Sequence, residues 1–175
     1  MKSMVTKRFL AALASLSFLL GCAGVPAGVE AVRNFEIQRY LGRWYEIARL
    51  DHSFERGLEK VYAEYGLRGD GGLRVVNRGF DPASGKWKEA TGRAYFAADE
   101  GVGMLKVSFF GPFYGAYNII ALDGDYTHAL VCGPNRDYLW ILSRTPAMEA
   151  STTAALVARA KALGFDTQRL VFVKH

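Results

Sequence analysis

The amino-acid sequence predicts an all-β protein, an eight-stranded up-and-down antiparallel barrel with one C-terminal α-helix packed on its outside. Three features of the sequence favour this fold. Short strand-like runs follow one another with no helix between them, turn residues separate the runs, and a single stretch with helical spacing comes after the last run. The chain has 175 residues, of which 50% are hydrophobic, so one domain can bury a substantial core.

The strand-like runs have the lengths and the turns of an antiparallel meander. Several of the intervening turns carry Asp, Gly and Pro at close spacing, as in 70–72 and 123–125, and such residues allow tight hairpins. Closing a meander of eight strands removes its free edges and leaves an interior large enough for one small ligand. We expect strands near 43–50, 61–68, 73–80, 86–97, 102–110, 115–122, 126–132 and 138–144.

The predicted helix occupies the stretch that follows the last strand. Thr145 and Pro146 fit its N-cap and first position, and Gly164 fits the position just after its end. Residues 169–173 read as a final short strand. One face of this helix is expected to pack on the barrel, with Met148, Thr152, Ala155, Leu156 and Leu163 on that face.

The N-terminus is typical of an export signal. Lys2, Lys7 and Arg8 precede an apolar stretch of 13 residues, 9–21, which is too short to span a bilayer as a mature helix. Leu19-Leu20-Gly21-Cys22 resembles the lipobox of bacterial lipoproteins. That resemblance implies cleavage after residue 21 and acylation of Cys22, and the residue after the cysteine, an alanine, implies the outer membrane, facing the periplasm. We therefore expect a signal peptide at 1–21, a lipidated tether at 22–33 and one domain at 34–175.

Three short motifs occur in a fixed order along the predicted barrel. Gly42-x-Trp44 lies on the first strand, Asp125-Tyr126 at the turn into the seventh, and Arg144 at the end of the eighth. Together they resemble the signature regions of the lipocalin family. The segments 106–123 and 128–146 resemble the bacterial outer-membrane lipoproteins of that family more closely.

The resemblance to lipocalins implies a protein that binds a small apolar ligand. The closer resemblance to the bacterial lipoproteins of the family narrows this ligand to fatty acids or (lyso)phospholipids. It implies no cofactor, and a homodimer is compatible with it. A ligand-holding barrel needs a closed end, and an arginine stacked on a tryptophan ring can provide one, with about 0.5–2 kcal/mol from the cation–π contact. We therefore interpret Gly42, Trp44 and Arg144 as a structural plug.

The ligand-lining residues are predicted by alternation along the strands. If Arg144 points inward, Leu142, Trp140 and Tyr138 share its face, and Trp44 similarly predicts Glu46 and Ala48. The resemblance adds Tyr117, Ile119 and Ala121 from the sixth strand. Loops after the odd-numbered strands are expected to form the mouth, with aromatic side chains at Phe54, Phe113 and Tyr114.

Other classes of function find little support in the sequence. Gly-x-Ser-x-Gly, Cys-x-x-Cys and His-Glu-x-x-His are absent, and the three histidines are scattered, so we expect neither an enzyme nor a metal site. Nineteen basic residues against 17 acidic ones remain after the apolar stretch, which argues against binding nucleic acid. Two alternatives stay open: a structural or stress-related envelope lipoprotein, and a carrier of another apolar ligand such as a tetrapyrrole. Cys132 is expected to be a buried free thiol.

Overall fold

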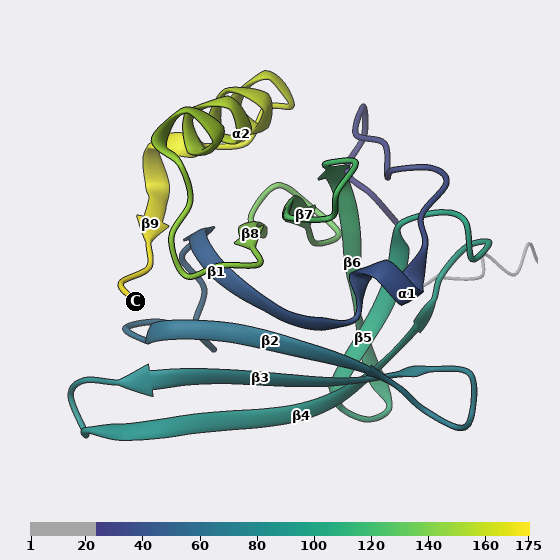
Figure 1. The fold of residues 1–175 in the computed structure, drawn as a ribbon, viewed down its shortest axis with the longest axis horizontal. Helices are drawn as coiled ribbons and strands as arrows, with labels where there is room; N and C mark the ends of the chain where they lie inside the picture. The colour runs from purple at the N-terminus through teal and green to yellow at the C-terminus, as the bar shows by residue number, and fades with distance from the viewer. Residues whose placement is uncertain (1–23) are drawn as a thin grey trace, which may run out of the picture.

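The computed structural model describes residues 24–175, which form a closed barrel of eight antiparallel strands (Figure 1). Consecutive strands pair from β2 to β8, and β1 pairs with both β8 and β2, which closes the barrel. The predicted barrel is therefore confirmed. Its strands are β1 (Gly42–Leu50), β2 (Glu59–Leu67), β3 (Leu73–Asp81), β4 (Lys86–Phe96), β5 (Met104–Phe110), β6 (Phe113–Leu122), β7 (His128–Cys132) and β8 (Leu139–Ser143).

One helix covers the outside of the barrel, as expected. Helix α2 (Ala150–Ala162) lies on the side opposite β2, β3 and β4 (Figure 1). It buries Leu156 and Ala160 against outward-facing side chains of the barrel, and this cluster includes Ile141 and the fully buried thiol of Cys132. The predicted burial of that thiol is confirmed. The short strand β9 (Leu170–Phe172) then pairs with the end of β1.

The helix begins later than the sequence predicted. Thr145 is not its N-cap, because its amide donates to Ser143 Oγ (3.2 Å) and its hydroxyl donates to the carbonyl of Ala147 (2.6 Å), which places it in a preceding turn. The N-cap is Glu149. The other end agrees with the prediction, since Gly164 follows the helix with φ +83°, a backbone angle that glycine adopts without strain.

Strand β1 contains an irregularity that changes which side chains face the interior. The pairing with β8 shifts between Glu46 and Ala48, so that Glu46 lies opposite Leu142 while Ala48 lies opposite Ile141. An extra residue of this kind reverses the alternation beyond it. The prediction that Ala48 points into the barrel is wrong: it packs in the outer cluster under α2, and Arg49, opposite Trp140, takes the inward position.

The two ends of the barrel differ in their connections. A short helix, α1 (Ile37–Tyr40), precedes β1 at one end, where the turn between β6 and β7 also lies. The loops from β1 to β2 and from β7 to β8 lie at the other end. The segment before α1 runs along the barrel, where Val29 is buried in the outer cluster and the Val32 amide donates to Ile119 O (2.9 Å). Within residues 24–175, no helix has both the length and the apolar character needed to cross a membrane.

Candidate functional site: the barrel interior

The end of the barrel next to α1 is filled by Trp44. Its ring is fully buried, stacks on Tyr40 with 4.6 Å between ring centroids, and donates from Nε1 to the Tyr40 carbonyl (2.8 Å). The guanidinium carbon of Arg144 lies 4.0 Å from the centre of the same ring. Gly42 has φ +90°, which a side chain would strain, and a Cβ there would lie 3.6 Å from Arg144 Nη1.

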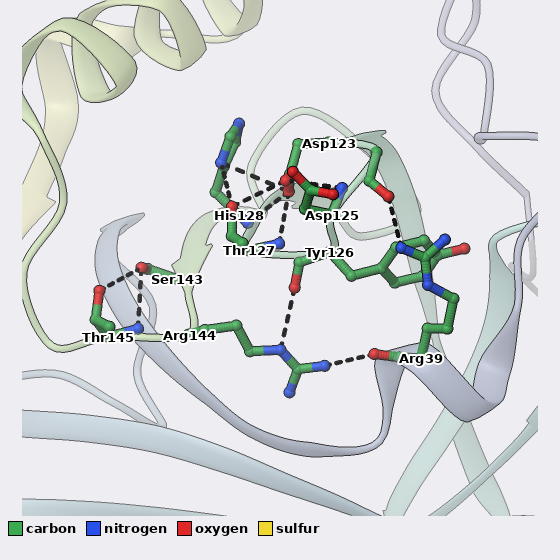
Figure 2. A network of polar contacts seen from close by, with 10 residues as sticks. Arg39, Asp123, Asp125, Tyr126, Thr127, His128, Ser143, Arg144 and Thr145 are labelled. Carbon is green, nitrogen blue, oxygen red and sulfur yellow. Dashed lines mark hydrogen bonds and ion pairs between the residues drawn. The ribbon is translucent and has the colours of Figure 1, made fainter.

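Arg144 also ties together three separate segments at this end (Figure 2). Its Nε donates to the carbonyl of Tyr126 (3.1 Å), and its Nη2 donates to the carbonyl of Arg39 (2.7 Å). Its Nη1 donates to two more carbonyls, those of Leu41 and Arg43, each at 2.9 Å. The side chain therefore closes this end of the barrel by contacts to α1, β1 and the turn before β7.

The turn between β6 and β7 is built around the Asp123 carboxylate (Figure 2). It accepts hydrogen bonds from the amides of Thr127 and His128, each at 2.7 Å. Burial alone would raise the pKa of Asp123, but these hydrogen bonds hold it below its usual value. Tyr126 in this turn accepts from the Glu36 amide (2.9 Å), and Arg39 lies 4.2 Å over its ring, so the turn is fixed to the segment before β1.

Most of the interior wall is apolar and aromatic. The same buried cluster contains Trp44 at the closed end and, further along the barrel, Tyr117 and Ile119 of β6 and Trp140 and Leu142 of β8. The structure thus brings together these four predicted residues. Ala121 of β6, also predicted to point inward, lies instead in the outer cluster under α2, beyond a register shift between β6 and β7. Sequence reasoning did not identify the other members of this wall, which include Tyr65, Leu73, Val75, Ala94, Leu105, Val107, Phe109, Ala129 and Val131.

Three tyrosine hydroxyls meet within this wall. The hydroxyl of Tyr117 lies 2.7 Å from that of Tyr40 and accepts a hydrogen bond from that of Tyr65 (2.9 Å). Burial raises the pKa of all three phenols, so they stay neutral and can both donate and accept. The chain of hydroxyls is the polar element nearest the plug.

Replacing Tyr117 by phenylalanine tests this chain of hydroxyls. Tyr117→Phe is expected to lower the free energy of unfolding by about 1–3 kcal/mol, because two buried hydroxyls lose their shared partner. Urea unfolding of the variant and the parent measures the difference. Tyr114→Phe is the matched control, because that ring lies on the outer surface; an equal loss in both variants would contradict the prediction.

The interior near the open end contains a group of buried ionisable side chains. Arg49 donates from Nη1 to Glu46 Oε1 (2.6 Å) and from Nη2 to the carbonyl of Glu55 (2.7 Å). Glu55 Oε2 accepts from Trp140 Nε1 (3.2 Å) and lies 3.1 Å from His52 Nε2. His52 and Glu55 belong to the β1–β2 loop, which therefore folds its polar side chains into the barrel.

The two carboxyl groups of this cluster differ in their surroundings. Burial, and next the negative charge of Glu55, raise the pKa of Glu46 well above its usual value, although Arg49 opposes the rise. Burial also acts to raise the pKa of Glu55, but the contacts with His52 and Trp140 outweigh it and lower that pKa. Of the two carboxyl groups, Glu46 therefore takes up a proton more readily and Glu55 gives one up more readily.

Three other predicted site residues, Tyr138 of the interior set and Phe113 and Tyr114 of the mouth, lie in different settings. Tyr138 stacks on Trp140 with 6.2 Å between centroids and lies beside His52. Phe113, 78% exposed, lies at the tip of the β5–β6 hairpin. Tyr114 lies beside Tyr95, with cations of β4 and β5 over its ring, so it packs along the outer surface and does not line the interior.

Two further expectations concern chemistry outside this wall. Cys22 lies outside the described residues. Among residues 24–175, His, Cys, Asp and Glu side chains nowhere gather in threes in a way that could hold a metal ion.

Comparison with known proteins identifies relatives along nearly the whole chain. The family model described as "Lipocalin-like domain" matches residues 35–175. The outer membrane lipoprotein Blc of Escherichia coli (strain K12) is 55% identical over 169 residues, which are 95% of this chain and 96% of that protein. The protein of the same name from Vibrio cholerae is 54% identical over 158 residues, 90% and 92% of the two chains. Temperature-induced lipocalin-1 of Arabidopsis thaliana is 39% identical over 154 residues, 81% and 80% of the two chains.

Solved structures show the same architecture at lower sequence identity. Insecticyanin from the tobacco hornworm Manduca sexta superposes with a TM-score of 0.70, at 21% identity and over 87% of each chain. Lobster apocrustacyanin A1 superposes with a TM-score of 0.62, at 20% identity, over 86% of this chain and 93% of its own. At these identities the likeness shows the fold alone.

Proposed function

The chain belongs to the lipocalin-like family, and from this premise we propose that it binds fatty acids or (lyso)phospholipids inside its barrel. The observation that carries the proposal is the wall of apolar and aromatic side chains that continues from Trp44 to Trp140. Binding involves no bond-making chemistry. The protein carries or stores the lipid by removing its acyl chain from water.

Burial of the acyl chain supplies the driving force for binding. Each methylene transferred from water contributes about 0.8 kcal/mol, so a chain of ordinary length gains several kcal/mol after the entropy of association is subtracted. Tyr117, Ile119 and Leu142 offer apolar surface of this kind, and Trp140 and Tyr138 offer flat rings nearer the mouth. The plug at Trp44 and Arg144 limits how deep the chain can reach.

Mass spectrometry of the purified protein tests the ligand directly. We expect native spectra to show acyl lipids bound one to a barrel, and organic extraction to release fatty acids or phospholipids. Titration with 1-monolaurin, an uncharged acyl ester, should give saturable binding. A barrel that carries no lipid on purification and fails to bind any acyl compound would contradict the proposal.

We also propose that the protein is anchored in the outer membrane through Cys22 and faces the periplasm. The support is the export signal and lipobox at its N-terminus, together with relatives named outer membrane lipoproteins. The first described residue, Gly24, follows two positions later, and its carbonyl accepts from Asn118 Nδ2 (3.3 Å). An acylated Cys22 would therefore hold the barrel close to the bilayer, since two residues span at most about 7 Å.

Replacing Cys22 by serine tests the anchor. Cys22→Ser is expected to remove the acyl mass and to move the protein out of the membrane fraction, because the thioether that holds the diacyl group cannot form and a single weak attachment gives only marginal binding. Membrane fractionation and intact mass measure the two effects. Cys132→Ser, at the buried thiol, is the control and should stay membrane-bound. A Cys22→Ser protein still found in the outer membrane would refute lipidation as the anchor.

A further inference from the structure

The buried cluster near the mouth has more hydrogen-bond donors than partners. Its four ionisable side chains are almost fully buried: Arg49 is 1% exposed, Glu46 3%, Glu55 6% and His52 7%. Arg49 Nε and both ring nitrogens of His52 are buried and have no hydrogen-bond partner within residues 24–175, although His52 Nε2 lies 3.1 Å from Glu55 Oε2. An unpaired buried donor is costly, and it is commonly paired with a ligand or a water molecule when one is present.

We propose that Arg49 and His52 form a subsite for an anionic head, a carboxylate or a phosphate ester, at the end of the acyl chain bound in the barrel. This inference rests on the proposed lipid binding and specifies which lipids the barrel favours. The free Arg49 Nε and His52 Nδ1 both suit an oxygen acceptor, and donors that carry a positive charge form the stronger hydrogen bonds. Trp140, whose ring centroid lies 5.2 Å from that of His52, connects the subsite to the apolar wall.

The charges already present determine how such a head can enter. We place a proton on Glu46, the carboxyl whose pKa burial raises, so that the cluster holds one permanent cation, Arg49, and one carboxylate, Glu55. An incoming anion would leave this buried site with an uncompensated negative charge, which is strongly unfavourable. Protonation of His52, beside Glu55 at 3.1 Å, restores neutrality. Binding of an anionic head is therefore coupled to the uptake of a proton.

The other groups around His52 do not supply this missing charge. Its ring faces the uncharged aromatic rings of Phe54, Tyr138 and Trp140. The nearby Asp51 carboxylate is paired with Arg56, whose Nε donates to Asp51 Oδ2 (2.7 Å) in an exposed contact. The phenol of Tyr65 on β2 stays neutral, because burial, and to a smaller extent the two carboxyl groups, raise its pKa. Imidazole ordinarily changes charge between about pH 5 and 8, which is therefore the range in which the coupling is tested.

Comparing the affinities of charged and uncharged ligands with equal acyl chains tests the subsite. The dissociation constants of laurate, lauroyl lysophosphatidic acid and 1-monolaurin are measured at about pH 6 and about pH 8, within the range of imidazole titration. The preference for an anionic ligand is the dissociation constant of monolaurin divided by that of the anionic ligand. For at least one anionic ligand we expect this ratio to be about tenfold greater at the lower pH, which corresponds to one charge-assisted hydrogen bond. Calorimetry in buffers of different ionisation enthalpy should show proton uptake with that ligand and none with monolaurin.

Three variants identify the residues responsible. His52→Gln should reduce the anionic preference about tenfold at the lower pH and abolish its pH dependence. Glu46→Gln should keep or increase the preference, because it fixes the neutral form of that side chain. Arg56→Gln removes an exposed cation from the same loop and should leave the preference unchanged. An equal pH dependence for laurate, lauroyl lysophosphatidic acid and monolaurin would overturn the subsite, even if His52→Gln fails to fold.

Two further outcomes separate this inference from the proposal on which it rests. If monolaurin binds and neither anionic ligand is preferred, lipid binding stands and the subsite is wrong. If no acyl compound binds, the proposed function itself fails. Inorganic phosphate and acetate serve as head groups without a chain: displacement of laurate by either ion at comparable concentration would mean that the site binds free anions, which overturns the role of the acyl chain.

Discussion

Replacing Arg144 by alanine is expected to lower the free energy of unfolding by about 2–4 kcal/mol, one of the largest effects of any single side chain in this barrel. The side chain donates to four carbonyls at 2.7–3.1 Å and lies over the Trp44 ring. Its removal leaves those carbonyls short of a charged donor and uncovers the ring. The side chain is only partly buried, so water can replace some of these hydrogen bonds and limit the loss.

Urea unfolding followed by tryptophan fluorescence measures this loss. Arg144→Lys is the informative control, because it keeps the positive charge but cannot reach several carbonyls at once with a planar fork of donors. We expect its stability to lie between those of the parent and Arg144→Ala. The affinity for monolaurin should change much less than the stability. An Arg144→Ala protein that keeps its unfolding midpoint but no longer binds would place Arg144 in the ligand site.

The wall of the barrel was predictable wherever a strand alternates regularly. Strand β8 pairs with β7 without a register shift, and alternation from Arg144 placed Leu142 and Trp140 in the interior correctly. In β1 the same reasoning failed after Glu46. A strict alternation would have sent Arg49 outward to solvent, whereas the bulge turns it inward, where it donates to Glu46 Oε1 (2.6 Å).

The sequence around Glu46 carries a signal for this bulge. Glu46 and Arg49 carry opposite charges three positions apart and enclose two apolar residues, Ile47 and Ala48. In a regular strand, neighbouring side chains point to opposite faces. If both apolar side chains pack against the helix outside the barrel, the strand must contain a bulge between them. The pattern is weak by itself, because a regular strand with one exposed charge would show the same letters.

The inward turn of the β1–β2 loop could not be predicted from local sequence. Nothing near His52 and Glu55 specifies their direction, because loop side chains follow no fixed alternation. Their positions depend on partners distant in the chain: Glu55 accepts from Trp140, 85 residues away, and His52 packs against the rings of Tyr138 and Trp140. These contacts exist only after the barrel has closed.

Replacing Trp140 by glutamate is expected to weaken the binding of monolaurin by about a hundredfold or more, while the barrel stays folded. The ring of Trp140 belongs to the interior wall, and its Nε1 donates to Glu55 Oε2 (3.2 Å). A carboxylate in its place would face the acyl chain and repel the Glu55 carboxylate. Monolaurin is the right ligand because its uncharged head removes simple repulsion between ligand and protein. Circular dichroism verifies the fold before titration.

Two other substitutions show whether the effect belongs to the interior position of Trp140. Trp140→Phe keeps an aromatic wall and loses only the hydrogen bond to Glu55, so its affinity should fall less than about tenfold. Trp87→Glu introduces the same charge on β4 at a half-exposed ring that contacts Phe80 and Arg78, and it should leave affinity unchanged. Ligand binding should also change the fluorescence of Trp140 in a Trp87→Phe background, since Trp44 stays buried beneath Arg144. If Trp140→Glu binds monolaurin as tightly as Trp87→Glu does, the acyl chain does not pass this ring, and the ligand must occupy a different part of the barrel.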